Sequence, residues 1–251
     1  MRGRGAVRTV TRSRPGEHAL LATPRRDIAT VAALAVVTTA FFVAMAMAGP
    51  RARIGRLDAH FLHLMVSIRT PWLTTIAKGF NFVGLVAVTL PIRFLIAGFL
   101  AIRRRWWHLV AFATAVVVSE VFIGTLKGLY ARGRPPGSLV ATSGYSFPSG
   151  HAVAASVTAV AAVIALFPEG TGRYAWGTVA VAFSGLMGLS RAYLAAHWLS
   201  DAVAGVLLGT SCALVMALLV HAIRIRREGA DGPEAAAGRG GGRSPPRGPA
   251  P

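Results

Sequence analysis

Apolar residues in this chain gather into long blocks that are separated by short polar or charged stretches. A block of about 20 apolar residues is long enough to cross the hydrocarbon core of a bilayer as a helix. The pattern predicts an all-α, integral membrane bundle of six transmembrane helices, at residues 28–48, 82–102, 109–126, 151–167, 176–189 and 199–223. We therefore expect one membrane domain over 28–223, with disordered tails at 1–27, which is basic, and at 224–251, which is rich in Gly, Pro and Arg.

Two stretches allow a different interpretation. The first apolar block ends on Ala46-Met47-Ala48, which resembles the cleavage site of a signal peptide. Its apolar core and its basic leader are both longer than is usual for such a peptide, so we expect a retained helix. Residues 51–78 are mixed, with apolar positions at helical spacing and with Asp58 and Arg69 at the ends of the periodic part. This spacing predicts an amphipathic helix on the bilayer surface, and Pro71 interrupts the chain after it.

Charge is distributed unevenly along the chain. The formal net charge is +18, and Arg is concentrated in the first 26 residues and after residue 223. Basic flanks of this kind are typical of cytoplasmic ends that face anionic lipid, so we expect no nucleic-acid partner. With Arg103, Arg104 and Arg105, they place both termini in the cytoplasm, whereas Arg51, Arg53 and Arg56 favour the opposite orientation. In either case, six spans put the polar connections 127–150 and 190–198 on one membrane face, predicted to be the outer one.

Candidate chemistry is restricted by what the chain lacks. Cys212 is its only cysteine, which excludes an intrachain disulfide and a thiolate metal cluster. The nine carboxylates are spread along the chain, and a two-metal hydrolase would need several of them clustered. We therefore predict metal-free chemistry without a cofactor.

The connection 127–150 carries groups suited to an anion. Lys127 and Arg134 are cations, and a guanidinium can bind two phosphoryl oxygens at once. Ser149 and Gly150 directly precede a predicted helix, whose N–H groups and dipole favour an anion. Arg132 either adds to this positive field or, as we favour, meets lipid headgroups. Glu120, inside the third span, is expected either to balance a cation in the bundle or to pair with another polar group there, rather than to take part in chemistry.

The connection 190–198 supplies a third cation, Arg191, and a histidine followed four residues later by a carboxylate. If a helix includes both His197 and Asp201, the carboxylate accepts the Nδ1–H and leaves Nε2 to act as base or nucleophile. His151 opens the fourth span, where it can protonate a leaving oxygen. The alternatives are a structural ion pair for the first two residues and a helix-capping role for His151. Taken together, the groups of the two connections suit phosphoryl transfer through a phosphohistidine on His197.

These residues resemble the three-part signature of the type 2 phosphatidic acid phosphatase superfamily. Lys127 to Pro135 match K-x6-R-P, residues 148–151 match P-S-G-H, and residues 190–201 match S-R-x5-H-x3-D. The resemblance covers roughly residues 57–215 and implies a metal-independent membrane lipid phosphatase. It further implies catalytic roles for His197, His151 and Asp201, and phosphate binding by Lys127, Arg134, Ser149, Gly150 and Arg191. Vanadium haloperoxidases have a similar site, but they are soluble.

The expected function is hydrolysis of a lipid phosphate or diphosphate monoester of the phosphatidic acid, phosphatidylglycerol phosphate or polyprenyl diphosphate type. Two alternatives remain at this stage: a lipid-linked phosphotransferase that passes the phosphoryl group to an alcohol, and a non-catalytic lipid-phosphate binder or transporter. The expected partners are the lipid substrate and membrane lipids, with no obligate protein partner. Hydrolysis needs both histidines and Asp201, whereas binding alone does not.

Overall fold

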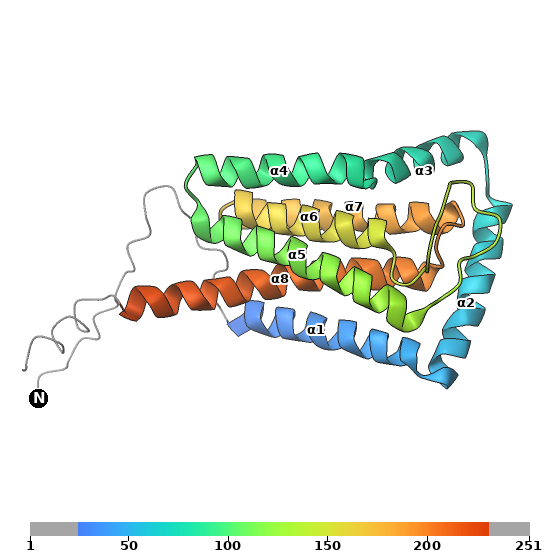
Figure 1. Cartoon of the computed structure of the whole chain (residues 1–251), viewed down its shortest axis with the longest axis horizontal. Coiled ribbons are helices and arrows are strands. Elements are labelled where there is room, and N and C mark those ends of the chain that lie inside the picture. The colour runs from blue at the N-terminus through green and yellow to red at the C-terminus, as the bar shows by residue number, and fades with distance from the viewer. Residues whose placement is uncertain (1–24, 231–251) are drawn as a thin grey trace, which may run out of the picture.

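A computed structural model describes residues 25–230, and within this range the chain forms eight helices and no strand. The helices are α1 (Arg25–Ala46), α2 (Ala48–Ser67), α3 (Pro71–Val83), α4 (Val86–Ile102), α5 (Trp106–Tyr130), α6 (Gly150–Leu166), α7 (Thr171–Tyr193) and α8 (Leu199–Ala230). Helices α1 and α4 to α8 run alongside one another, while α2 lies across one end of this bundle (Figure 1). The tails expected at 1–27 and 224–251 fall mostly outside the described residues.

Helix α6 forms the centre of the bundle, because eleven of its seventeen residues are buried. Small side chains on α6 and α8 let the two backbones come close. A Cβ atom at Gly205 of α8 would lie 2.7 Å from the carbonyl oxygen of Ser149, and one at Gly209 would lie 2.6 Å from that of Val153. The two glycines are four residues apart, the small-xxx-small spacing of close helix pairs in membranes. This contact ties the start of α6 to the first half of α8.

The expected spans agree with the helices, but the predicted count of six is not established. Among the described residues, α1, α5 and α8 are long and apolar enough to cross a membrane. The pair α3 and α4, bent by 51° at its break, adds a fourth candidate, whereas α6, with 17 residues, is a shorter apolar helix than α1, α5 and α8. The count therefore stays a prediction.

Some boundaries differ from the sequence prediction. Pro71 does interrupt the chain, but it also starts α3, a separate helix that was not anticipated, in which Thr70 accepts a hydrogen bond from the N–H of Leu73. Helix α8 continues to Ala230, seven residues past its predicted end. Its last turns are basic, yet Arg224 forms an ion pair of 2.8 Å with Glu228 one turn later, which stabilises the extension.

An ion pair between buried Arg93 and half-exposed Glu120 helps to connect three helices of the bundle. Arg93 of α4 is 8% exposed; its Nη1 donates to Oε1 of Glu120 on α5 over 2.7 Å, and its Nε donates to Oγ1 of Thr158 on α6 over 2.9 Å. Glu120 therefore balances a cation, as expected, and that cation is Arg93. A charge at this depth is costly unless it is paired, so the pair contributes to holding α4 against α5 and α6.

Candidate active site

The two polar connections meet at the end of the bundle that α2 crosses (Figure 1). A main-chain hydrogen bond of 3.0 Å runs from the N–H of Ser149, at the start of α6, to the carbonyl oxygen of Asp201, in the first turn of α8. A second bond of 2.9 Å joins the N–H of Leu139 to the carbonyl oxygen of Leu194. The structure therefore brings together the three parts of the signature.

His197 and Asp201 face each other, but not through a shared helix. Helix α8 begins only at Leu199, so the expectation that both residues lie on one helical face is wrong. Asp201 instead turns back over the first turn of α8, where its Oδ2 accepts the N–H of Trp198 at 2.9 Å and lies 3.5 Å from Nδ1 of His197. Helix N-termini favour a carboxylate in this position, because it satisfies an unpaired N–H and meets the positive end of the dipole.

Burial decides the charge of His197, which is 3% exposed. Removal from water lowers its pKa to about 4, and the nearby guanidinium groups of Arg191 and Arg134 act in the same direction. The nearby carboxylate of Asp201 opposes this shift only in part. The imidazole is therefore neutral near pH 7, which is the form that a nucleophile requires.

Of the three cations expected from the signature, Arg134 and Arg191 lie near this imidazole, and Lys127 lies near the two arginines. Arg134 donates to the carbonyl oxygens of Ser143 and Ala196, each at 2.7 Å, and its Nη1 lies 3.2 Å from Nε2 of His197. Lys127 donates to the carbonyl oxygen of Tyr145 over 2.6 Å. Burial lowers the pKa of Arg134, and the charge of Asp201 opposes that shift. The hydrogen-bond partners of Lys127 and Arg134 are main-chain carbonyl oxygens and the neutral ring of His197, which carry no compensating charge, so the two cations favour the binding of an anion.

Four buried polar atoms at signature positions have no hydrogen-bond partner. They are Oγ of Ser149, Nε2 of His151, Nε of Arg191 and Nδ1 of His197. Buried polar groups are nearly always satisfied, so a concentration of exceptions in one place needs an explanation. A bound oxyanion would supply acceptors to the donors among them. Gly150 adds space, because a Cβ there would have no heavy atom within 4 Å.

Comparison with known proteins agrees with this geometry. Residues 104–225 match the sequence model of the PAP2 superfamily. Phosphatidylglycerophosphatase B of Bacillus subtilis (strain 168) is 31% identical over an alignment of 182 residues, and the match covers 67% of this chain and 86% of the relative. The chain belongs to the PAP2 superfamily. As a member with membrane-spanning helices, it is an integral-membrane phosphatase of the PAP2 type, and its substrates are lipid phosphates.

Two solved structures share the fold. The crystal structure of a transmembrane PAP2-type phosphatidylglycerolphosphate phosphatase from Bacillus subtilis matches with a TM-score of 0.61 and 25% identity, over 78% of this chain and 96% of that one. Aquifex aeolicus LpxE matches with a TM-score of 0.53 over 64% of this chain and 94% of that one. The latter is 23% identical and supports the fold alone.

The structure also adds residues to this PAP2 site that the sequence did not reveal. Asn81 of α3 accepts a hydrogen bond from Nη1 of Arg191 through its Oδ1, and its backbone carbonyl accepts one from the ring of His151. Gly84 lies against the same ring, since a Cβ there would be 2.4 Å from Cδ2 of His151. An amide and a glycine in an apolar run carry no signal of their own in one sequence, so only the contacts identify them.

Arg132 fits neither role that the sequence suggested for it. Its Nη1 donates to Oδ1 of Asp201 at 2.7 Å, and its Nη2 donates to Oδ2 of Asp58 at 2.6 Å. Asp58, expected at the end of a surface helix, is only 2% exposed. The reason is that α2 turns this one polar residue toward the bundle, where the guanidinium and the start of α8 meet it.

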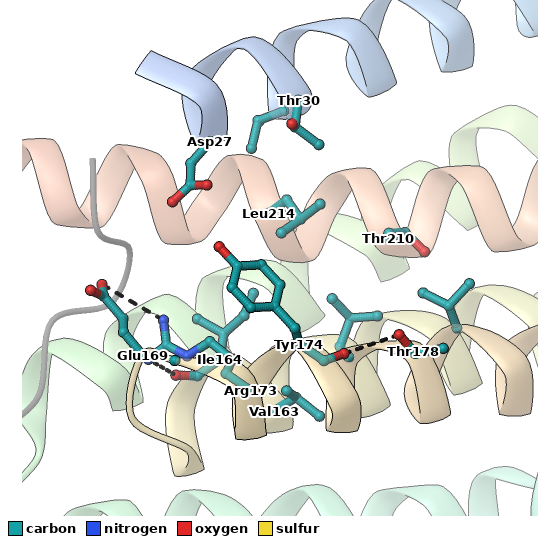
Figure 2. Close-up of a pocket in the computed structure, with 15 residues that line it drawn as sticks. Asp27, Thr30, Val163, Ile164, Glu169, Arg173, Tyr174, Thr178, Thr210 and Leu214 are labelled. Carbon is teal, nitrogen blue, oxygen red and sulfur yellow. Dashed lines mark hydrogen bonds and ion pairs between the residues drawn. The ribbon is translucent and has the colours of Figure 1, made fainter. Parts of the chain in front are cut away.

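The bundle contains a smaller cavity near the site and a larger one far from it. An apolar cavity of about 210 Å³ between α4, α6 and α7 is lined by Val83 and Met187, which are close to His151. A larger cavity of about 800 Å³ lies at the other end of α6 and α7, where Figure 2 shows Glu169 and Arg173 joined at its edge and Asp27 of α1 nearby. Because α6 has 17 residues and rises about 1.5 Å per residue, the larger cavity cannot share a phosphoryl group with the histidines.

Metal ligands are sparse here. No group of three His, Cys, Asp or Glu side chains between residues 25 and 230 is arranged to hold a metal ion. The cations of the site are instead side chains: Lys127, Arg134 and Arg191.

Proposed function

We propose that this phosphatase hydrolyses the terminal phosphomonoester of phosphatidylglycerol phosphate, without a metal ion, through a phosphohistidine intermediate on His197. The observation that carries the proposal is the cluster of unsatisfied buried polar atoms on Ser149, His151 and Arg191 beside three cations, with Nε2 of His197 only 3.2 Å from Nη1 of Arg134. The names of the two Bacillus subtilis relatives support the choice of lipid. Phosphatidic acid and polyprenyl diphosphates present the same phosphoryl group and are the substrates to compare.

In the first step, Nε2 of His197 attacks phosphorus while the bond from phosphorus to the glycerol oxygen breaks. The departing oxygen takes a proton from His151, and the alcohol product, phosphatidylglycerol, leaves. Lys127, Arg134, Arg191 and the N–H groups at Ser149 and Gly150 hold the three remaining oxygens, on which negative charge is spread in the transition state. Asp201 stabilises the positive charge that develops on the ring of His197.

In the second step, His151, now neutral, accepts a proton from water as that water attacks phosphorus. The nitrogen–phosphorus bond breaks, its electron pair returns to Nε2 of His197, and inorganic phosphate leaves. His151 is then protonated again for the next turnover. The cycle consumes one water molecule and one phosphomonoester and needs no other reactant.

We place this reaction on the outer face of the membrane, with both termini in the cytoplasm. The support is the distribution of charge over the bundle. Arg103, Arg104 and Arg105 join α4 to α5 at the end opposite the site, and α8 ends there with Arg226 and Arg227 (Figure 1). Short basic segments of this kind favour the cytoplasmic side.

The test is phosphate release by the purified full-length protein in detergent over the lipids named above. We expect the highest kcat/KM with phosphatidylglycerol phosphate, and no turnover by His197→Ala. His63→Ala changes an exposed histidine of α2 and serves as the matched control. Wild-type turnover by His197→Ala would refute the nucleophile, and a strong preference for another lipid would refute the substrate. Release of a phosphorylated alcohol instead of phosphate would identify the phosphotransferase alternative.

A further inference from the structure

Arg132 bridges two carboxylates that are almost completely withdrawn from solvent. The side chains of Asp58 and Asp201 are 2% and 0% exposed, and that of Arg132 is 11% exposed. Each carboxylate binds a different terminal nitrogen of the guanidinium, at 2.6 and 2.7 Å. The arrangement joins α2, the connection after α5 and the start of α8.

Asp58 also holds the first turn of α8 directly. Its Oδ1 accepts the N–H of Ser200 at 2.9 Å, and its Oδ2 accepts the hydroxyl of Ser200 at 2.6 Å. Ser200 directly precedes Asp201, so the backbone of Asp201 is tied to α2 through Ser200, and its side chain is tied to α2 through Arg132. The carboxylate of Asp58 meets an N-terminal turn, where unpaired N–H groups and the helix dipole favour negative charge.

The two carboxylate oxygens of Asp201 have different partners. Arg132 occupies Oδ1, while Oδ2 faces Nδ1 of His197 at 3.5 Å and accepts the N–H of Trp198. The guanidinium is itself held over the ring of Trp198, with 5.5 Å from its Cζ to the ring centroid. A carboxylate fixed at both oxygens cannot rotate away from the imidazole that it orients.

We propose that Asp58 and Arg132 are positioning residues that act on the reaction through Asp201, so that the orientation of the nucleophile His197 depends on α2. This inference rests on the proposed function, because it assigns work to the pair of His197 and Asp201. Neither Asp58 nor Arg132 touches the substrate. Their role is to hold the carboxylate while positive charge appears on the ring of His197.

A double-mutant cycle tests whether Asp58 acts on the reaction through Asp201. Asp58→Asn should lower kcat by on the order of 10²-fold, the cost of misplacing a reacting group by about 1 Å, while KM changes by less than about threefold. Asp201→Asn removes the carboxylate charge through which Asp58 and Arg132 are proposed to act. In that background, adding Asp58→Asn should reduce the residual kcat by no more than about twofold, because residues that act through one another are not additive.

Stability must be separated from positioning. Asp58→Asn leaves Arg132 partly unpaired, so each variant is also measured by thermal unfolding in detergent. If the single variant does not fold, the double variant Asp58→Asn/Arg132→Gln removes both charges together and should still show the low kcat. Arg132→Lys keeps the charge but cannot reach two carboxylates with one ammonium group, and it should recover only part of the rate.

Glu120→Gln is the matched control, since it breaks an ion pair of the same 2.7 Å length between α4 and α5, away from the histidines. Its effect on kcat should be the same with Asp201 and with Asn at that position. Losses from Asp58→Asn and Asp201→Asn that multiply, or an unchanged kcat in Asp58→Asn, would overturn the inference. Either result leaves the proposed function intact if His197→Ala is inactive, whereas activity of His197→Ala would refute the function itself.

Discussion

Asn81 and Arg191 are separated by 110 positions in the chain, yet the amide oxygen of the first accepts a hydrogen bond from Nη1 of the second. Arg191 is 3% exposed and has an unsatisfied Nε, so it is held at one nitrogen and open at another. Helix α3 thereby supports the cation on α7 to which we assign phosphate binding. The same residue of α3 holds His151 through its backbone carbonyl.

We expect Asn81→Ala to weaken phosphate binding. The loss of a hydrogen bond to a charged group costs about 1.5–3 kcal/mol, which corresponds to a rise in KM of about tenfold or more. The backbone contact with His151 does not depend on the side chain, so kcat should fall much less. Steady-state kinetics decide this. Lys78→Ala, at an exposed position of the same helix, is the control, and an unchanged KM in Asn81→Ala would contradict the role of this amide.

Gly84→Ala should reduce kcat by displacing His151. The added Cβ would lie 2.4 Å from Cδ2 of His151 and 3.1 Å from the sulfur of Met187. The φ angle of Gly84 is −80°, so alanine introduces no backbone strain and only the steric effect remains. We expect a loss of about 10²-fold in kcat. Gly79→Ala meets no atom within 4 Å and should be neutral; equal rates for the two variants would disprove the contact.

The pKa of His197 should be far below that of an ordinary histidine. Burial lowers its pKa to about 4, so the ring is protonated only below that pH and is neutral, and nucleophilic, throughout the neutral range. NMR of the labelled imidazole, assigned by its disappearance in His197→Ala, measures the midpoint directly. A midpoint at or above 6.5 would show that the ring is more solvated than its 3% exposure indicates.

Gly205→Ala should lower both stability and activity. Its Cβ would come within 2.7 Å of Cβ of Ala152 and of the carbonyl oxygen of Ser149, and both of these belong to the α6 side of the contact with α8. Forcing an extra methyl group into such a contact costs about 1–3 kcal/mol. Thermal unfolding and phosphate release are both measured. Gly185→Ala on α7 has open space and should change neither; a fully stable Gly205→Ala would show that the helices can separate.

Phosphate release should continue in EDTA and should be inhibited by vanadate. The donors and cations around His197 are side chains and N–H groups, and a five-coordinate oxyanion resembles phosphorus during attack. The inhibition constant for vanadate should rise in Arg191→Lys. Activity that is lost in EDTA and restored by Mg²⁺ would contradict a metal-free reaction.

The membrane helices and the meeting of the signature residues followed from local patterns. Apolar runs located α1 and α4 to α7 to within about five residues and the start of α8, though not its end, and the parity of the expected spans put the two polar connections at one end of the bundle. The pairing of His197 with Asp201 was anticipated for the wrong reason, since spacing in the sequence does not tell a shared helical face from a carboxylate that turns back over a helix start.

Other parts of the site had no local signal. Asp58 sits in an amphipathic segment, where a carboxylate is expected to face water, and its partner Arg132 is 74 positions away. Asn81 lies in an apolar stretch, and its role appears only through Arg191. The free energy of such contacts comes from tertiary packing, which periodicity does not report.

The hydrogen bond of 3.0 Å between the N–H of Ser149 and the carbonyl oxygen of Asp201 joins the two halves of the site through main-chain atoms alone. The distance between the start of α6 and the start of α8 is consequently set by the peptide chain and by Gly205 and Gly209 behind it. Substitution of the side chains around the site can therefore change affinity and chemistry while the spacing between these two helix starts stays the same.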